Sequence, residues 1–141
     1  MKKVNIYINS DINSAKKTNG KYIYILELIT DKEPITLTGS DKLIEASKND
    51  AYTIALAKAL SRLKSECELA IFLENEYVFN AIEHYLEGWK ERGWKNSKNE
   101  DVKNAEIWQQ IAETLEKYKF TLYLHEKHEY KDWMERQLSK V

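Results

Sequence analysis

The sequence is short of cysteine and of long apolar runs. It has a single cysteine, Cys67, in 141 residues, which excludes an internal disulfide and is typical of a reducing compartment. We interpret Cys67 as a small buried apolar residue. No window approaches the roughly 20 apolar residues of a membrane span, and the N-terminus lacks the apolar stretch of about 7–15 residues of a signal peptide. The sequence therefore predicts a cytoplasmic protein with no membrane partner.

An excess of either charge is also missing. The 22 Lys and Arg residues nearly balance the 23 Asp and Glu residues, so the formal net charge is −1. Because nucleic-acid-binding domains are usually basic overall, any such surface must be a local patch. The length predicts one domain over residues 1–141 with one core. The sequence gives no clear sign of oligomerisation, so we expect a monomer.

Strand-like patterns dominate the first 40 residues. Apolar residues alternate with polar ones in residues 4–10, and residues 21–29 and 34–39 are rich in β-formers. Pro34, the only proline, begins the third run, where a missing N–H is tolerated. The polar run 11–20 ends in Gly20 and predicts a loop.

The rest of the chain predicts helices separated by two more strands. Residues 49–66, 75–89, 105–118 and 130–140 have helical spacing or composition, and residues 68–74 and 119–125 are strand-like runs. In the second helix, Val78 and Ile82 share one face with either Tyr85 or Leu86. The resulting order, β-β-β-α-β-α-α-β-α, predicts an α/β fold in which helices pack on a mixed sheet.

An unusual run, GWKERGWKNSKNEDVKN at residues 88–104, separates the second and third helices. Together with its flanks, this run resembles the ribonuclease H family, in its bacterial ribonuclease HI-like form. The resemblance implies a five-stranded mixed sheet whose first three strands are antiparallel, with helices on both sides and a basic handle. The positions that match the family pattern are Tyr77, Val78, Trp89, Lys90, Arg92, Gly93, Trp94, Lys95, Val102, Lys103, Asn104, Glu106, Ile107, Trp108 and Gln109.

In the family, the handle helps to hold an RNA–DNA hybrid. Here residues 89–104 carry five cations against three carboxylates, which makes a local basic patch that can neutralise phosphates. The resemblance thus assigns nucleic-acid contacts to this segment, and the alternative for the two tryptophans is that they only pack the helix junction. The handle residues assigned to nucleic-acid binding are Trp89, Lys90, Arg92, Trp94, Lys95 and Lys98.

The resemblance also implies a catalytic site, which is altered in this chain. The family holds two Mg²⁺ ions about 4 Å apart with four carboxylates. Those positions fall on Asn9, Tyr52, Glu74 and Glu135, so two carboxylates are replaced by neutral groups and two are lengthened. Mg²⁺ tolerates misplaced ligands poorly, so we expect its binding to be weak or absent. The alternative is a single weak ion held by Asp11, Glu74 and Glu135.

Other family positions that contact the hybrid are partly kept. By the overlay, Asn49 faces the minor groove and Ser47 belongs to a DNA-phosphate pocket. Glu76 replaces a glutamine, and Tyr85 replaces a tryptophan that lines the channel. Lys16 and Lys17 stand in place of a glycine-rich turn, and either His125 or His128 matches the family's loop histidine.

Three hypotheses follow for the function. The first is a catalytically inactive or impaired ribonuclease H-like domain that binds an RNA–DNA hybrid or duplex. The second is an active metal-dependent endoribonuclease with a remodelled carboxylate site. The third is a protein-interaction domain that kept only the fold. We favour the first, because the binding positions are better retained than the metal-binding ones.

Overall fold

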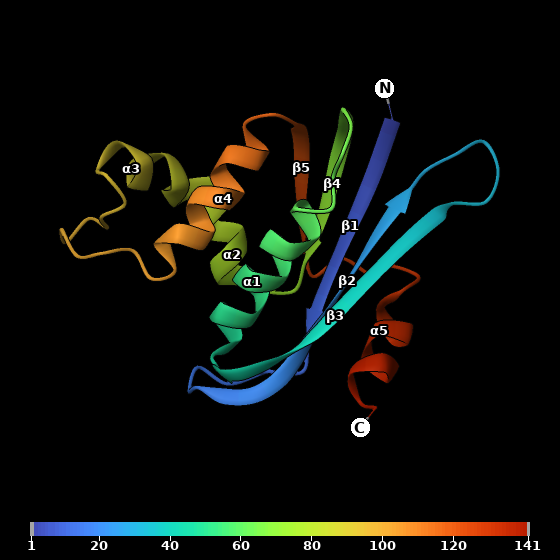
Figure 1. The fold of residues 1–141 in the computed structure, drawn as a ribbon, viewed down its shortest axis with the longest axis horizontal. Coiled ribbons are helices and arrows are strands. Elements are labelled where there is room, and N and C mark those ends of the chain that lie inside the picture. The colour runs from blue at the N-terminus through green and yellow to red at the C-terminus, as the bar shows by residue number, and fades with distance from the viewer. Residues whose placement is uncertain (1, 141) are drawn as a thin grey trace.

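The computed structural model describes residues 2–140 and contains one five-stranded sheet with the order β3-β2-β1-β4-β5 (Figure 1). The strands are β1 (Lys2–Ser10), β2 (Thr18–Leu28), β3 (Ile35–Ala46), β4 (Cys67–Leu73) and β5 (Lys119–Leu124). The helices are α1 (Lys48–Leu60), α2 (Glu76–Asn80), the π-helical turn η1 (Ala81–Tyr85), α3 (Leu86–Glu91), α4 (Ala105–Leu115) and α5 (Lys131–Leu138).

The strand directions confirm the expected mixed sheet. β1 pairs antiparallel with β2, and β2 pairs antiparallel with β3. β4 lies parallel to both β1 and β5. Parallel neighbours need crossover connections, which α1 supplies before β4 and the helices from α2 to α4 supply before β5.

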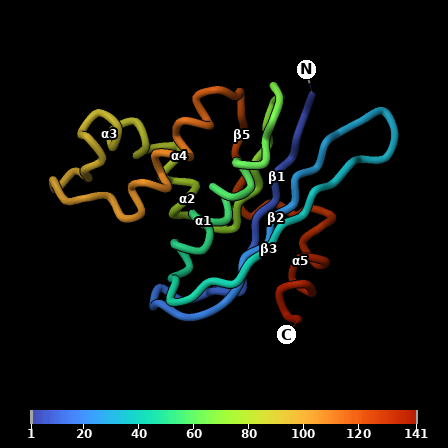
Figure 2. Tube along the Cα trace, viewed as in Figure 1, coloured from blue at the N-terminus to red at the C-terminus, as the bar shows by residue number. Residues whose placement is uncertain are grey.

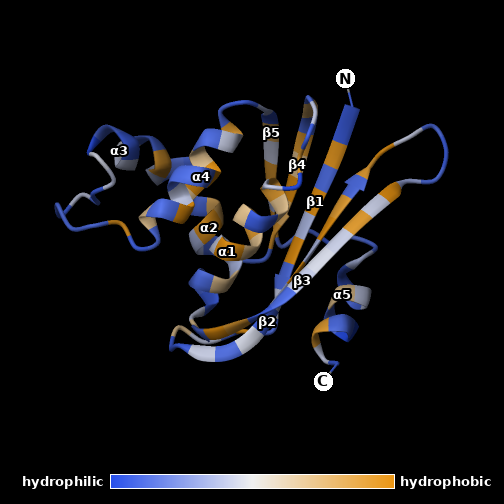
Figure 3. Ribbon diagram, viewed as in Figure 1, coloured by the Kyte–Doolittle hydropathy of each residue, from blue (hydrophilic) through white to orange (hydrophobic). Residues whose placement is uncertain are grey.

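Helices cover both faces of the sheet, as expected. Alternate residues of β1 point to opposite faces, so Ile6 and Ile8 join the main core with α1 and α4, while Tyr7 joins a smaller cluster with Met134 and Leu138 of α5. Hydrophobic residues concentrate along the central strands, and the outer loops are hydrophilic (Figure 3). No helix in residues 2–140 is long and apolar enough to cross a membrane.

α5 is fixed to the sheet by a buried carboxylate. Glu27 of β2 is 3% exposed and accepts hydrogen bonds from Asn5 Nδ2 at 2.9 Å and from the Tyr7 hydroxyl at 3.0 Å. The hydroxyl of Tyr130, just before α5, also donates to Glu27. The pKa of Glu27 is raised by burial, but these hydrogen bonds outweigh that effect and hold it below its usual range. This network sets where the side chains of α5 meet the end of β1.

The first two connections differ from the sequence-based expectation. β2 starts at Thr18, inside the predicted loop, and β3 continues to Ala46, well beyond residue 39. A side chain at Gly20 would place its Cβ 2.4 Å from Ile12 Cγ1, so glycine is needed there for close packing and not for a turn. Pairing between β2 and β3 satisfies backbone groups that local composition alone assigned to loops.

The predicted helix at residues 75–89 contains a π turn. The backbone N–H of Leu86 donates to the carbonyl of Ala81, five residues earlier. One inserted residue rotates the following face. Leu86 is consequently buried, and Tyr85 is 50% exposed. This settles which of the two residues joins the core.

The handle, residues 89–104, begins in α3, runs to the start of α4 and projects from the body (Figure 2). Its base is held by backbone hydrogen bonds from Trp94 to the Trp89 carbonyl at 2.7 Å and from Val102 to the Trp94 carbonyl at 3.1 Å. Gly93 and Trp94 both have a positive φ of 67°, which turns the chain sharply after α3. Asp101 pairs back to Lys95 and closes the loop.

Candidate nucleic-acid interface and altered active-site cavity

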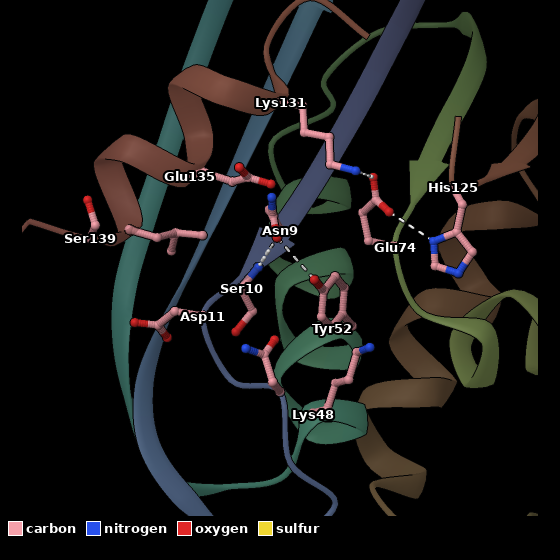
Figure 4. Close-up of a pocket in the computed structure, with 12 residues that line it drawn as sticks. Asn9, Ser10, Asp11, Lys48, Tyr52, Glu74, His125, Lys131, Glu135 and Ser139 are labelled. Carbon is pink, nitrogen blue, oxygen red and sulfur yellow. Dashed lines mark hydrogen bonds and ion pairs between the residues drawn. The ribbon is translucent and has the colours of Figure 1, made fainter. Parts of the chain in front are cut away.

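A cavity of about 460 Å³ lies where β1 and β4 end. It brings together all four family catalytic positions and Asp11, which come from β1, α1, the end of β4 and α5 (Figure 4). Such strand ends are where open α/β sheets commonly bind ligands. The residues that line the cavity are Asn9, Ser10, Asp11, Asn13, Lys48, Tyr52, Glu74, His125, Lys131, Glu135, Leu138 and Ser139.

The side chains of Asn9 and Tyr52 form a hydrogen bond with each other within this cavity. The Tyr52 hydroxyl donates to Asn9 Oδ1 at 3.1 Å, and the backbone N–H of Ser10 donates to the same oxygen at 2.8 Å. Tyr52 is only 3% exposed, and burial raises its pKa to about 12, so it stays a neutral donor. Because an amide oxygen has two lone pairs, Asn9 has no free acceptor position for a metal ion.

Glu74 is compensated by neighbouring side chains. Its Oε1 lies 3.4 Å from Lys131 Nζ, and its Oε2 lies 2.9 Å from His125 Nδ1. The Glu74 side chain is 14% exposed, so a partner is needed to offset its desolvation. The other ring nitrogen of His125 is 3.6 Å from Glu76 Oε1. Glu74 therefore has a cation and a histidine where the family places metal.

The two candidates for the loop histidine separate clearly in space. His125 follows β5 and lines the cavity. His128 instead packs against Tyr7, with ring centroids 4.3 Å apart, and burial lowers its pKa. Only His125 is placed to touch a ligand in the cavity.

The remaining carboxylates do not complete a metal site. Asp11 Oδ1 accepts the backbone N–H of Lys21 at 2.8 Å, and Glu135 is exposed on α5. Within residues 2–140, no group of three or more His, Cys, Asp or Glu side chains is close enough to hold a metal ion. The residues present therefore do not fit a two-metal centre, because Asn9 lacks a free acceptor, Tyr52 replaces a carboxylate and Glu74 is already paired.

A second cavity, of about 440 Å³, lies between the start of α1 and the end of the handle. Ser47, Asn49, Lys103 and Asn104 line it, and Asp50 sits among them. Asn49 Oδ1 accepts a hydrogen bond from Asn75 Nδ2 at 3.1 Å, which fixes its side chain. The cavity thus contains both positions, 47 and 49, that the overlay assigns to the hybrid.

Asp50 is the central group of this second cavity, although it is not among the predicted site residues. It accepts from the Ser47 backbone at 3.0 Å and from Asn104 Nδ2 at 2.9 Å, and it lies 3.2 Å from Lys103 Nζ. Burial raises its pKa, but these partners outweigh burial and hold the pKa at about 2. The signal in the sequence was Ser47-x-x-Asp50, a capping box that starts α1.

The handle cations are partly paired within the chain. Lys90 contacts Glu116 and lies 3.7 Å from Glu87, and Lys95 contacts Asp101. Arg92 Nε donates to the carbonyl of Lys95 at 3.1 Å, and Lys98 is exposed. Exposed ion pairs stabilise the fold little, so these cations can exchange carboxylate partners for phosphates.

The aromatic residues of the interface divide into core and surface. Trp89 is 7% exposed and meets Trp108 edge to face, with centroids 5.6 Å apart. Trp94 is half-buried against the same core. Tyr85 is exposed and lies over Trp89 with centroids 6.1 Å apart. Trp89 thus packs in the core, as expected if the tryptophans only pack the helix junction. Tyr85 presents the accessible ring.

Lys48 and Lys131 also line the first cavity, although neither is among the predicted site residues. Lys131 precedes Glu135 by one helical turn, a spacing that puts both on one face of α5. This four-residue spacing was the sequence signal that could have placed Lys131 beside Glu135 at the cavity. Lys16 and Lys17, by contrast, are exposed in the β1–β2 connection and line neither cavity.

Comparison with known proteins agrees with this architecture. The RNase H family pattern matches residues 2–130. Ribonuclease H of Agrobacterium fabrum is 36% identical over 94 residues, which cover 67% of this chain and 61% of that protein. Ribonuclease H of Rhizobium etli is 39% identical over 79 residues, covering 56% of this chain and 52% of that protein. The matched region thus spans about half to three fifths of these relatives' length.

Solved structures share the fold at low sequence identity. LC9-RNase H1, a type 1 RNase H with the type 2 active-site motif, has a TM-score of 0.76 at 12% identity, covering 96% of this chain and 69% of that one. Foamy viral protease-reverse transcriptase in complex with RNA/DNA hybrid has a TM-score of 0.70 at 14% identity, covering 97% of this chain and 19% of that one. With a family pattern that matches nearly its whole length, the chain belongs to the RNase H family.

Proposed function

We propose that this protein binds RNA–DNA hybrids and that its own residues do not form an effective two-metal nuclease. The observation that carries the proposal is the pairing of Tyr52 with Asn9 and of Lys131 with Glu74, which replaces metal binding by internal hydrogen bonds and ion pairs. The family positions that contact the hybrid are better kept than the catalytic positions. Two of them, Ser47 and Asn49, line one cavity.

Support for a nucleic-acid ligand comes from the surface beside this cavity. The handle carries cations whose ion pairs are exposed, and Tyr85 offers an accessible ring for stacking. One structural neighbour is described in complex with an RNA/DNA hybrid, and about a fifth of it, 19%, shares the fold of this chain. We infer that a hybrid lies across the handle and the two cavities.

The test is a binding and cleavage assay on one fluorescently labelled hybrid. Wild-type protein is expected to bind, with an affinity that falls steeply as salt rises, and to leave the RNA strand intact with Mg²⁺ present. The triple variant Lys90→Glu, Arg92→Glu, Lys95→Glu is expected to lose binding. A matched control reverses three exposed lysines elsewhere, Lys32→Glu, Lys42→Glu and Lys64→Glu.

Two outcomes would replace the proposal. Metal-dependent cleavage that disappears in Glu74→Gln would favour an active endoribonuclease, which the names of the curated relatives also suggest. Equal affinity of wild type, the handle variant and the control, with no salt dependence, would favour a protein-interaction domain. Circular dichroism of each variant shows whether the fold is retained.

A further inference from the structure

We propose that the cavity between Asn9 and Lys131 accepts a backbone phosphate of the nucleic acid directly, without a divalent metal ion between them. This inference rests on the proposed function and names the ligand chemistry of the altered active-site cavity. The chemical reason is that neutral hydrogen-bonding groups, Asn9 and Tyr52, stand at two positions where the family places metal-binding carboxylates, and that two lysines line the same cavity.

Asn9 turns a donor toward the cavity. Its amide oxygen is used by Tyr52 and by the Ser10 backbone. The amide nitrogen therefore points the other way, toward Glu135 on α5 (Figure 4). Two N–H groups at this place suit a phosphate oxygen and repel a cation.

Two lysines reach the cavity from opposite sides. Lys131 comes from the start of α5 and Lys48 from the first residue of α1. The backbone N–H of Lys48 donates to the Ser14 carbonyl at 2.8 Å, which fixes where α1 begins. Lys48 and Asn13 line both cavities, so a nucleic-acid backbone that crosses from one cavity to the other passes Lys48.

Most carboxylates that line the cavity already have hydrogen-bond or ion-pair partners. His125 and Lys131 both contact Glu74, so Glu74 keeps a partner when Lys131 turns to a phosphate. Asp11 is held by the Lys21 backbone. Glu135 is exposed, and the proposed ligand would meet its negative charge. Direct phosphate binding and metal binding therefore predict opposite effects of removing Glu135.

The experiment measures hybrid affinity by fluorescence polarisation in EDTA and in Mg²⁺. Wild type is expected to bind with the same dissociation constant in both, within about twofold. Lys48→Gln and Lys131→Gln should each weaken binding by about tenfold, the scale of one lost charged hydrogen bond. Glu135→Gln should tighten binding in both buffers. Lys58→Gln, an exposed lysine of the same helix α1, is the matched control and should bind like wild type.

The inference is overturned if Lys48→Gln and Lys131→Gln bind like wild type while the handle variant loses affinity, and in that case the proposed function still holds. It is also overturned if wild type binds only with Mg²⁺ and Glu135→Gln weakens that binding, because both results require a metal bridge. A wild type that binds no hybrid in either buffer refutes both proposals together. Thermal melts of each variant exclude unfolding as the cause.

Discussion

The Tyr52 hydroxyl donates to Asn9 Oδ1 across 3.1 Å, which joins α1 to the end of β1 at the centre of the altered cavity. In the family overlay both positions carry carboxylates that bind metal. Here the pair is neutral and satisfied, so no ion is needed to offset charge repulsion. The hydrogen bond thus satisfies both side chains without an ion between them.

Restoring both carboxylates should create a metal requirement. In Asn9→Asp with Tyr52→Glu, two negative charges would lie close together in a buried site and would destabilise the fold unless a cation is bound. We expect Mg²⁺ to bind the double variant measurably in titration calorimetry and to raise its melting temperature. Tyr52→Phe is the control, because it removes the hydroxyl without adding charge. If calorimetry shows the same heat for wild type and the double variant, our overlay of the site is incorrect.

The Asp50 network should make stability depend on pH in the acidic range. The pKa of Asp50 is about 2 in the folded protein against an ordinary value of 3.8, so its ionised form stabilises the fold above the ordinary pKa. That contribution, about 2 kcal/mol, is lost as pH falls from about 4 to about 2. Asp50→Asn should therefore be less stable than wild type at pH 6 and nearly equal to it at pH 2.

Urea unfolding at several pH values measures this effect. Asp31→Asn, in the exposed β2–β3 hairpin, serves as the control and should show no comparable convergence. A constant difference between wild type and Asp50→Asn across the whole range would mean that the network contributes through packing and not through charge.

The rings of Trp89 and Tyr85 are stacked, but Trp89 should contribute to stability and Tyr85 to hybrid binding. Trp89→Ala removes a buried ring and should destabilise the protein by about 3–5 kcal/mol. Tyr85→Ala removes an exposed ring and should leave the melting temperature nearly unchanged. If Tyr85 stacks on a base, its loss should cost hybrid affinity on the order of 1–3 kcal/mol. Melting curves and polarisation titrations of the two variants, compared side by side, test this; a Tyr85→Ala variant with wild-type affinity would remove Tyr85 from the interface.

Much of the fold was predictable because its signals are local. Alternation in residues 4–10 and apolar runs at 68–74 and 119–125 marked three strands correctly to within two residues. The start of β2 and the end of β3 were not predictable, because long-range pairing holds these residues in the sheet, Thr18 opposite Ala46 and Gly20 opposite Leu43. The π turn at Ala81 was also invisible, since nothing in the local composition distinguishes it from a regular helical turn.

The site shows the same division. The motif around Trp89 and Trp94 indicated the family, and the neutral residues at 9 and 52 predict a weakened metal site, which stays a prediction. Motif spacing gives the family positions, and residue type gives the charge at each of them. Which partners compensate those charges depends on long-range packing: Lys131 from α5 meets Glu74 after β4, and Lys103 and Asn104 from the handle meet Asp50 on α1. These contacts bring segments that are far apart in the chain within a few ångströms of one another. At that distance Coulomb and hydrogen-bond energies are large, so the tertiary structure decides which residues are partners.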